Sequence, residues 1–294
     1  TGLSARTTNG NINIKTGTGG TLTGGRYGAG LDATTTGAGS INLDLNAKVS
    51  GYGGVRTSAV DGATNIKAQA DITGNYALLS SSNSGAIAIT TSGSVLGGAV
   101  GVRAESNTGN ISMNLGGEVM GSVGVFAQSA GDITINTVGK VTGGGAGIVA
   151  NATGKGAVTV TTKGQISAYD GVVTSTEDGW NTVNIGSGGI KATHSGVIAT
   201  ATGTGSVKIQ IHGDISSTNE FGSDTSYGVA AATKSGSIQI DLDAGKFVSG
   251  GTAGIFVQSQ TGAATINNSG TITASGSGVG VLIDVNDGSA TLNN

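Results

Sequence analysis

The side chains best suited to acid–base chemistry are two carboxylates that stand two residues apart. Asp241 and Asp243 flank Leu242, and an extended segment would present both carboxylates on one side because alternate side chains of a strand share a face. Glycoside hydrolases use such pairs for general acid–base catalysis. The matching segments of the neighbouring repeats contribute amides or His212 and no further carboxylate. We therefore interpret the pair as a solvated strand face.

The chain has two histidines, His194 and His212, and no cysteine. A serine triad needs a hydroxyl, an imidazole and a carboxylate to converge, and no nucleophile motif accompanies either histidine. Two histidines without cysteine disfavour a zinc site, and the glycine-rich segment 276–280 is not followed by the helix of a nucleotide-binding loop. We predict no enzyme activity, no catalytic residues, no cofactor and no bound metal.

Aromatic side chains beside charged ones are the strongest candidates for binding a partner. They occur in 26–27, 177–180 and 220–227, and the first and last of these segments belong to longer repeats. Exposed aromatics next to charge are typical of binding hot spots, although each ring could instead fold back over the edge of the fold. The candidate partner-binding residues are Arg26, Tyr27, Glu177, Asp178, Trp180, Glu220, Phe221, Asp224 and Tyr227.

One unit of roughly 25 residues recurs along the chain, and such a period indicates a repeat architecture. Each unit begins with an apolar-x-apolar pair, continues with glycine and an apolar residue, and ends with Gly-apolar-x-small. The repeats begin at Ile12, Ile41, Thr64, Ile87, Ile111, Ile133, Val158, Val183, Val207, Ile238, Ala264 and Ala290.

Each unit holds three short segments in which apolar and polar residues alternate, which predicts three strands and no helix. Stacked units would pair each strand with its equivalents above and below. The pattern predicts an all-β, right-handed, single-stranded parallel β-helix with three faces and about eleven coils. Residues 1–294 would form a single domain, a rod on the order of 50 Å long. We expect the last coil, opened by 290–292, to continue beyond Asn294.

Composition agrees with this geometry. There are 57 glycines, no proline and a net charge of −3. Disordered chains and collagen are rich in proline, and interior strands exclude it. We expect glycine to supply positive φ at corners such as 53–54, 97–98 and 143–145. Outward polar residues would stack into ladders, and one such ladder comprises Asn13, Asn42, Ser112, Thr134, Thr159 and Lys208.

The units Gly10-Asn11-Ile12-Asn13-Ile14 and Gly101-Val102-Arg103-Ala104 resemble the passenger domains of type V secretion proteins, the autotransporters of Gram-negative bacteria. The resemblance covers essentially the whole chain and includes the scarcity of cysteine and proline. It implies secretion or display at the bacterial outer membrane. That family's translocator barrel is absent from this sequence. Adhesins and proangiogenic passengers that mimic a vascular growth factor are two similar groups.

From the resemblance and the aromatic loops, we expect a secreted or surface-displayed virulence passenger that binds a host-cell surface protein or receptor. It would act as an adhesin or as a receptor-engaging effector, in the latter case as an agonist of a vascular growth-factor receptor. The alternatives are a structural stalk or self-associating rod that aggregates bacteria and, third, a glycan-processing enzyme. The acidic balance lacks the basic footprint of a nucleic-acid partner, and no apolar run is long enough for membrane insertion.

Overall fold

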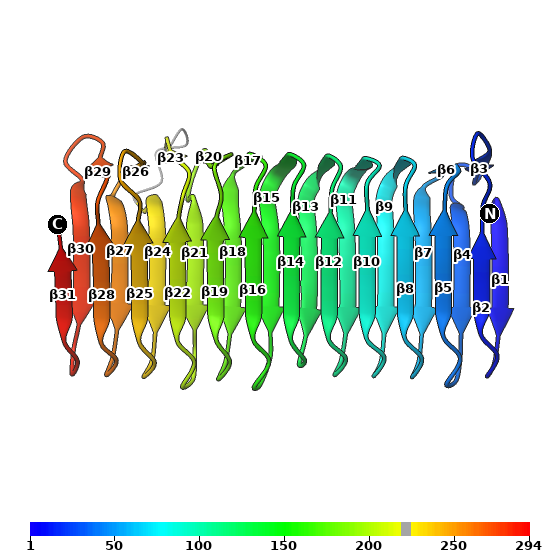
Figure 1. Cartoon of the computed structure of the whole chain (residues 1–294), viewed down its shortest axis with the longest axis horizontal. Coiled ribbons are helices and arrows are strands. Elements are labelled where there is room, and N and C mark those ends of the chain that lie inside the picture. The colour runs from blue at the N-terminus through cyan, green and yellow to red at the C-terminus, as the bar shows by residue number, and fades with distance from the viewer. Residues whose placement is uncertain (219–224) are drawn as a thin grey trace. The chain divides into compact units, whose positions relative to one another are not determined.

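The computed structural model describes residues 1–218 and 225–294. The fold is an all-β parallel β-solenoid of about 12 turns, and the described residues contain no helix (Figure 1). The predicted fold class is thus confirmed. The chain comprises two compact units, Thr1–Thr142 and Gly143–Asn294, which we call unit 1 and unit 2. Among the described residues, no helix has the length and apolarity to span a membrane.

The first strand of each repeat pairs with the first strands of the neighbouring repeats, and together these strands form one sheet within each unit. These strands pair in parallel within each unit, each with its equivalent in the next turn. In unit 1 they are β2 (Ile12–Lys15), β5 (Ile41–Leu45), β8 (Thr64–Ala68), β10 (Ile87–Thr91), β12 (Ile111–Leu115) and β14 (Ile133–Thr137). In unit 2 they are β16 (Val158–Thr162), β19 (Asn181–Ile185), β22 (Val207–Ile211), β25 (Ile238–Leu242), β28 (Ala264–Asn268) and β31 (Ala290–Asn293).

In most turns, the rest of the turn contributes a short second strand and a longer third strand. The second strands are β3 (Thr21–Thr23), β6 (Lys48–Ser50), β17 (Ile166–Ala168), β20 (Ile190–Ala192), β23 (Ile215–Ser217), β26 (Phe247–Gly250) and β29 (Thr271–Ala274). The third strands are β1 (Leu3–Thr7), β4 (Ala29–Thr35), β7 (Gly53–Ala59), β18 (Asp170–Thr176), β21 (Val197–Ala201), β24 (Tyr227–Thr233), β27 (Ala253–Ser259) and β30 (Val279–Val285). In four turns the two strands are continuous: β9 (Ile72–Ser82), β11 (Val95–Ser106), β13 (Val119–Ser129) and β15 (Val141–Ala152).

Alternation within each strand determines which side chains form the core. In β5, Ile41, Leu43 and Leu45 are buried, whereas Asn42 and Asp44 face outward. Equivalent residues lie opposite one another in successive strands, so branched apolar side chains stack on their own kind inside each unit. The same registers confirm the predicted outward ladder, from Asn13 in unit 1 and from Thr159 in unit 2.

One repeat boundary differs from the prediction. Asn181, not Val183, lies opposite Val158 and begins the β19 repeat. Asn181 is fully buried at a position where other repeats place Ile, Val, Thr or Ala, so the apolar pattern misplaced the start by two residues. Its amide Nδ2 donates a hydrogen bond of 3.0 Å to the carbonyl of Thr200, and its Oδ1 has no hydrogen-bond partner among the described residues.

Glycine is required mainly because successive turns approach closely. At one turn position a glycine lies against the carbonyl group of its equivalent in the preceding turn, so an added Cβ would overlap that oxygen. This glycine row comprises Gly39, Gly62, Gly85 and Gly109 in unit 1 and Gly179, Gly205, Gly236, Gly262 and Gly288 in unit 2.

The predicted positive φ at the glycine corners is wrong for every described position tested. Gly53, Gly54, Gly97, Gly98 and Gly143 all lack it. Four of them are instead crowded: a Cβ on Gly54, for example, would lie 2.6 Å from a methyl group of Ile72. The composition therefore reflects the close approach of neighbouring backbone more than left-handed turns.

Candidate functional site

Trp180 is a large exposed side chain on the turn that leads from β18 into β19. Its side chain is 60% exposed, although its carbonyl oxygen accepts a hydrogen bond of 2.8 Å from the amide of Val158. The next residue, Asn181, is buried, so by strand alternation Trp180 faces outward. The indole thus stands at the edge of the outward face formed by Thr182 and Asn184 and their equivalents.

The two acidic residues of this turn fasten it to the turns on either side. The Glu177 carboxylate accepts a hydrogen bond of 2.9 Å from the amide of Gly154. Oδ1 of Asp178 accepts hydrogen bonds from the amide and the hydroxyl of Thr204, at 2.8 and 2.9 Å. These two bonds lower the pKa of Asp178, the backbone bond most. Both carboxylates therefore help to hold the turn that presents Trp180.

The structure describes residues 225–227 of the candidate segment 220–227. Glu220, Phe221 and Asp224 lie outside the described residues. Tyr227 is half-buried, and its ring stacks on that of Phe256 with centroids 5.0 Å apart. Tyr227 thus follows the alternative in which an aromatic ring packs against the fold.

Trp180 and Tyr227 do not share a patch. In Figure 1 the connections that lead into β19 and its equivalents lie along the lower edge of unit 2. Strand β24, which Tyr227 begins, starts at the upper edge. Within unit 2, Trp180 is therefore the one predicted aromatic that the described structure presents openly.

Arg26 and Tyr27 form an exposed pair in unit 1, on the connection between β3 and β4. Tyr27 is 81% exposed, and the Arg26 guanidinium carbon lies 5.5 Å from the centre of its ring. This is a cation–π contact, and at such an exposed site it contributes about 0.5–1 kcal/mol. The two predicted side chains thus contact each other and form one exposed candidate surface in unit 1.

Both histidines pair with aspartates. Nδ1 of His194 lies 2.7 Å from a carboxylate oxygen of Asp170, and its ring stacks on Tyr169 with centroids 4.7 Å apart. Nδ1 of His212 lies 2.7 Å from the carboxylate of Asp243. Among the described residues, no three His, Cys, Asp or Glu side chains gather closely enough to hold a metal ion.

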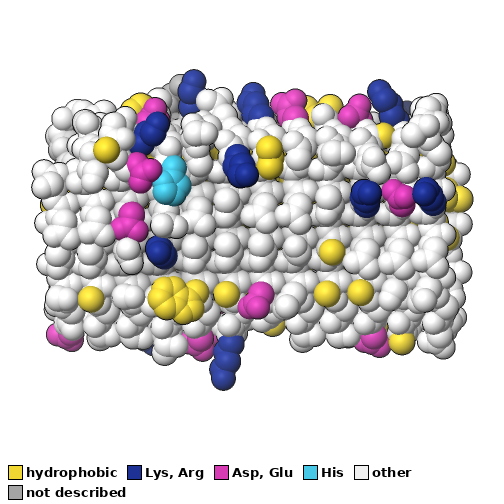
Figure 2. Space-filling model, viewed as in Figure 1, with side chains coloured by type: hydrophobic (Ala, Val, Ile, Leu, Met, Phe, Trp, Pro, Cys, Tyr) yellow, Lys and Arg dark blue, Asp and Glu magenta, His cyan; other side chains and the backbone are white. Residues whose placement is uncertain are grey.

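Asp241 and Asp243 have different hydrogen-bond partners. Asp241 accepts hydrogen bonds from the amides of Gln239 and Asn267, the latter at 2.6 Å, while Asp243 is engaged by His212. Figure 2 shows basic, acidic and histidine side chains gathered over the C-terminal strands of this face, in unit 2. The arrangement is a hydrogen-bonded polar surface of a β-sheet.

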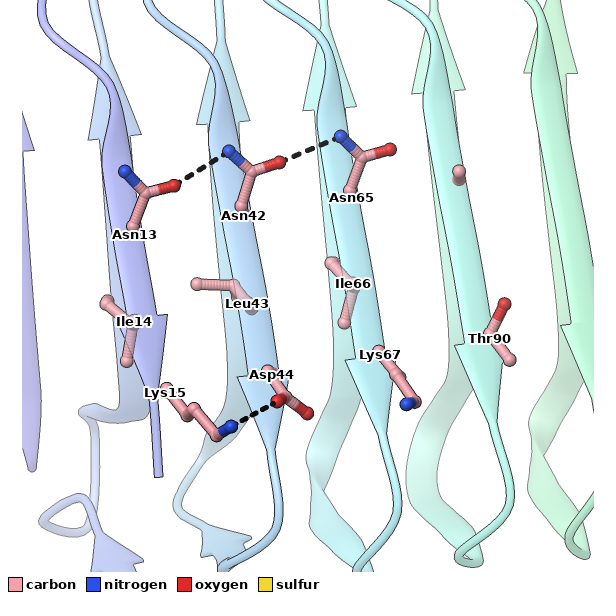
Figure 3. A pocket seen from close by; sticks show the side chains of 11 residues that line it. Asn13, Ile14, Lys15, Asn42, Leu43, Asp44, Asn65, Ile66, Lys67 and Thr90 are labelled. Atoms are coloured by element: carbon pink, nitrogen blue, oxygen red, sulfur yellow. Dashed lines mark hydrogen bonds and ion pairs between the residues drawn. The ribbon is translucent and has the colours of Figure 1, made fainter. Parts of the chain in front are cut away.

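An amide ladder crosses the outward face of β2, β5 and β8 in unit 1. Asn42 donates from Nδ2 to Oδ1 of Asn13, and Asn65 donates in the same way to Asn42, both at 2.9 Å (Figure 3). Asparagine at one outward position of three successive repeats is the sequence signal for this row. Neighbouring amides of the row hydrogen-bond to one another, so the row is ordered before any partner binds.

A groove of about 440 Å³ runs beside this ladder and was not predicted. Its other border is a charged row, in which Nζ of Lys15 lies 3.6 Å from the carboxylate of Asp44 and Lys67 follows on the next strand. Leu43 and Ile66 belong to the strip between the rows (Figure 3). The groove exists because the residue between two outward side chains of a strand turns inward.

A scan against protein-family models finds no match for this chain, and searches of curated proteins and of solved structures find no significant match. The comparisons therefore assign no family, and the resemblance to autotransporter passengers stays a prediction. The architecture that can be stated is a parallel β-solenoid of about 12 turns.

Proposed function

We propose that this chain is a non-enzymatic recognition module of a secreted or surface-displayed bacterial protein, and that it binds a host-cell surface protein. The observation that carries the proposal is Trp180, a 60% exposed indole on a turn that is hydrogen-bonded to both neighbouring turns. Tryptophan is among the residues most enriched in binding hot spots.

The held turn strengthens this interpretation energetically. Binding usually costs free energy to order side chains and loops, and a surface that is already ordered avoids part of that cost. Glu177 and Asp178 hold the turn in place, so Trp180 would enter a partner's pocket with little reorganisation of the backbone. The adjacent outward face contributes uncharged hydrogen-bonding groups such as Thr182 and Asn184. An apolar anchor with a polar surround is the usual anatomy of a protein–protein interface.

The test measures saturable binding of the purified, monodisperse chain to cultured endothelial and epithelial cells. Trp180→Ala should weaken binding by at least about tenfold, the usual effect of removing a hot-spot side chain. Val138→Ala is the matched control, because Val138 is a similarly exposed apolar residue, at 57%, in unit 1. Equal affinity of the two variants would refute the assignment of Trp180.

Receptor tyrosine phosphorylation, read in parallel, separates the two forms of the proposal. Binding with phosphorylation favours a released effector that engages a receptor, and binding without it favours an adhesin.

The second candidate function is self-association, which the preformed amide ladder of Asn13, Asn42 and Asn65 favours. Absence of cell binding together with concentration-dependent sedimentation would replace the recognition proposal with self-association.

A further inference from the structure

A second hollow lies on the outward face of the third strands of unit 1. Its volume is about 230 Å³, and β7, β9 and β11 form its base. In the strand register Arg56 lies opposite Leu79, and Leu79 lies opposite Arg103. Ser81 and Glu105 are paired in the same way one outward position further along. We call it the Arg56 hollow; its outward lining is Arg56, Tyr76, Leu79, Ser81, Arg103 and Glu105.

The two guanidinium groups of this hollow differ in what already holds them. Arg103 donates to the Glu105 carboxylate at 2.6 Å, and its guanidinium carbon lies 5.0 Å from the centre of the Phe126 ring. The hydrogen bond with Glu105 is the main reason that the pKa of Arg103 is raised. This cation is therefore fixed in place as one wall of the hollow.

Arg56, by contrast, has no ion-pair partner in the described part of the chain. Asp32 is its direct neighbour in the strand register, yet that carboxylate pairs with Arg6 at 3.7 Å and accepts a hydrogen bond from Thr34. Arg56 is exposed and lines the hollow, so its five N–H donors are available to a ligand.

The remaining walls add apolar surface and hydroxyl chemistry. Leu79 lies between the two arginines, which are two strands and roughly 10 Å apart. Tyr76 is half-buried at the rim of the hollow. Its ring packs edge-to-face against the ring of Tyr52, with the ring centroids 5.8 Å apart. Ser81 offers a hydroxyl, and the Glu105 carboxylate has lone pairs beyond those that Arg103 uses. Such mixed walls suit a ring that has an apolar face, hydroxyl groups and one anionic group.

We propose that the Arg56 hollow binds a carboxylated monosaccharide unit, either a sialic acid or a uronic acid. The sugar carboxylate would receive paired hydrogen bonds from the Arg56 guanidinium, whose planar fork matches a carboxylate. The ring would lie over Leu79 beside Tyr76, and its hydroxyls would donate to Glu105 and exchange hydrogen bonds with Ser81. This site lies in unit 1 and does not rest on the recognition function proposed for Trp180.

The experiment titrates the intact chain with the methyl glycosides of N-acetylneuraminic acid, glucuronic acid and glucose, and with sodium sulfate, following amide chemical shifts. Either acidic sugar should bind saturably, with neutral glucoside at least about tenfold weaker because the charged hydrogen bonds are lost. Whichever acidic sugar binds more tightly identifies the source of the carboxylate. Sulfate that binds as well as both acids would overturn the sugar assignment.

Matched variants test the role of Arg56 itself. Arg56→Gln should weaken the acidic sugar at least about tenfold, whereas Lys67→Gln, which removes an exposed cation from the other sheet of unit 1, should not. Leu79→Ser tests the apolar floor independently of charge and should also weaken the sugar. Thermal melts of all variants establish that each is folded. Equal affinities for the Arg56 and Lys67 variants, or no saturable binding at millimolar sugar, would refute the proposal.

Discussion

Gly62→Ala should destabilise the solenoid because the glycine row leaves no room for a methyl group. An added Cβ would overlap the carbonyl oxygen of Gly39 and would lie 2.8 Å from the amide nitrogen of Ser40. These are backbone atoms, so they cannot rotate out of the way as a side chain could. The overlap can be relieved only if the two turns move apart, and this is opposed by the hydrogen bonds that hold their strands at a spacing of about 4.8 Å.

The magnitude follows from two opposing effects. Overpacking a well-filled site costs about 1–3 kcal/mol, and contact with backbone places Gly62 near the upper end. Replacing glycine by alanine also restricts the unfolded chain, which restores about 0.4–1 kcal/mol. The net loss is about 2 kcal/mol, equivalent to a fall in melting temperature of about 3 °C if the 294 residues unfold together.

The assay is thermal unfolding followed by circular dichroism, with Gly17→Ala as the control. Apart from Gly17 and its two chain neighbours, no heavy atom of the described residues lies within 4 Å of a Cβ built on Gly17, and its φ is not positive. That variant should therefore be as stable as the parent or slightly more stable. If Gly62→Ala melts at or above the temperature of the parent and of the control, the close stacking of turns is refuted as the reason for the glycine row.

Two further predictions concern single polar residues. Asn181→Val should raise the free energy of unfolding by about 1 kcal/mol, because it removes a buried Oδ1 without a partner and matches Val158 and Val207 on the adjoining strands. Urea unfolding measures this, and a lower midpoint would contradict it. The lowered pKa of Asp178 means that its stabilisation is present above the unfolded value of about 4 and is lost as pH falls through the folded value. The melting temperature of Asp178→Asn should therefore fall less than that of the parent when the pH is lowered from 5 to 2.5. An equal fall in both proteins would show that the hydrogen bonds to Thr204 do not depend on the charge of Asp178.

The sequence alone was sufficient to determine the repeat and the parallel solenoid. The predicted three strands per turn are separate in most turns, but in β9, β11, β13 and β15 the second and third strands are continuous. These features follow from local alternation of apolar and polar residues, which any extended strand translates into an inner and an outer side. The outward ladder that starts at Asn13 could be predicted for the same reason. The predicted start of one repeat was wrong because its first residue, Asn181, is polar and yet buried. A hydrophobic pattern cannot identify a buried polar side chain that hydrogen-bonds to the backbone in the core.

Only the tertiary structure decided what lies beside what across neighbouring turns. It committed Asp178 to Thr204, left Trp180 exposed, and packed Tyr227 against Phe256. The Arg56 hollow also depends on residues that are more than twenty positions apart in sequence and become neighbours through strand register. Sequence periodicity specifies the side on which a residue lies, but a hydrogen bond or hollow depends on side-chain directions and distances that exist only once the turns are stacked.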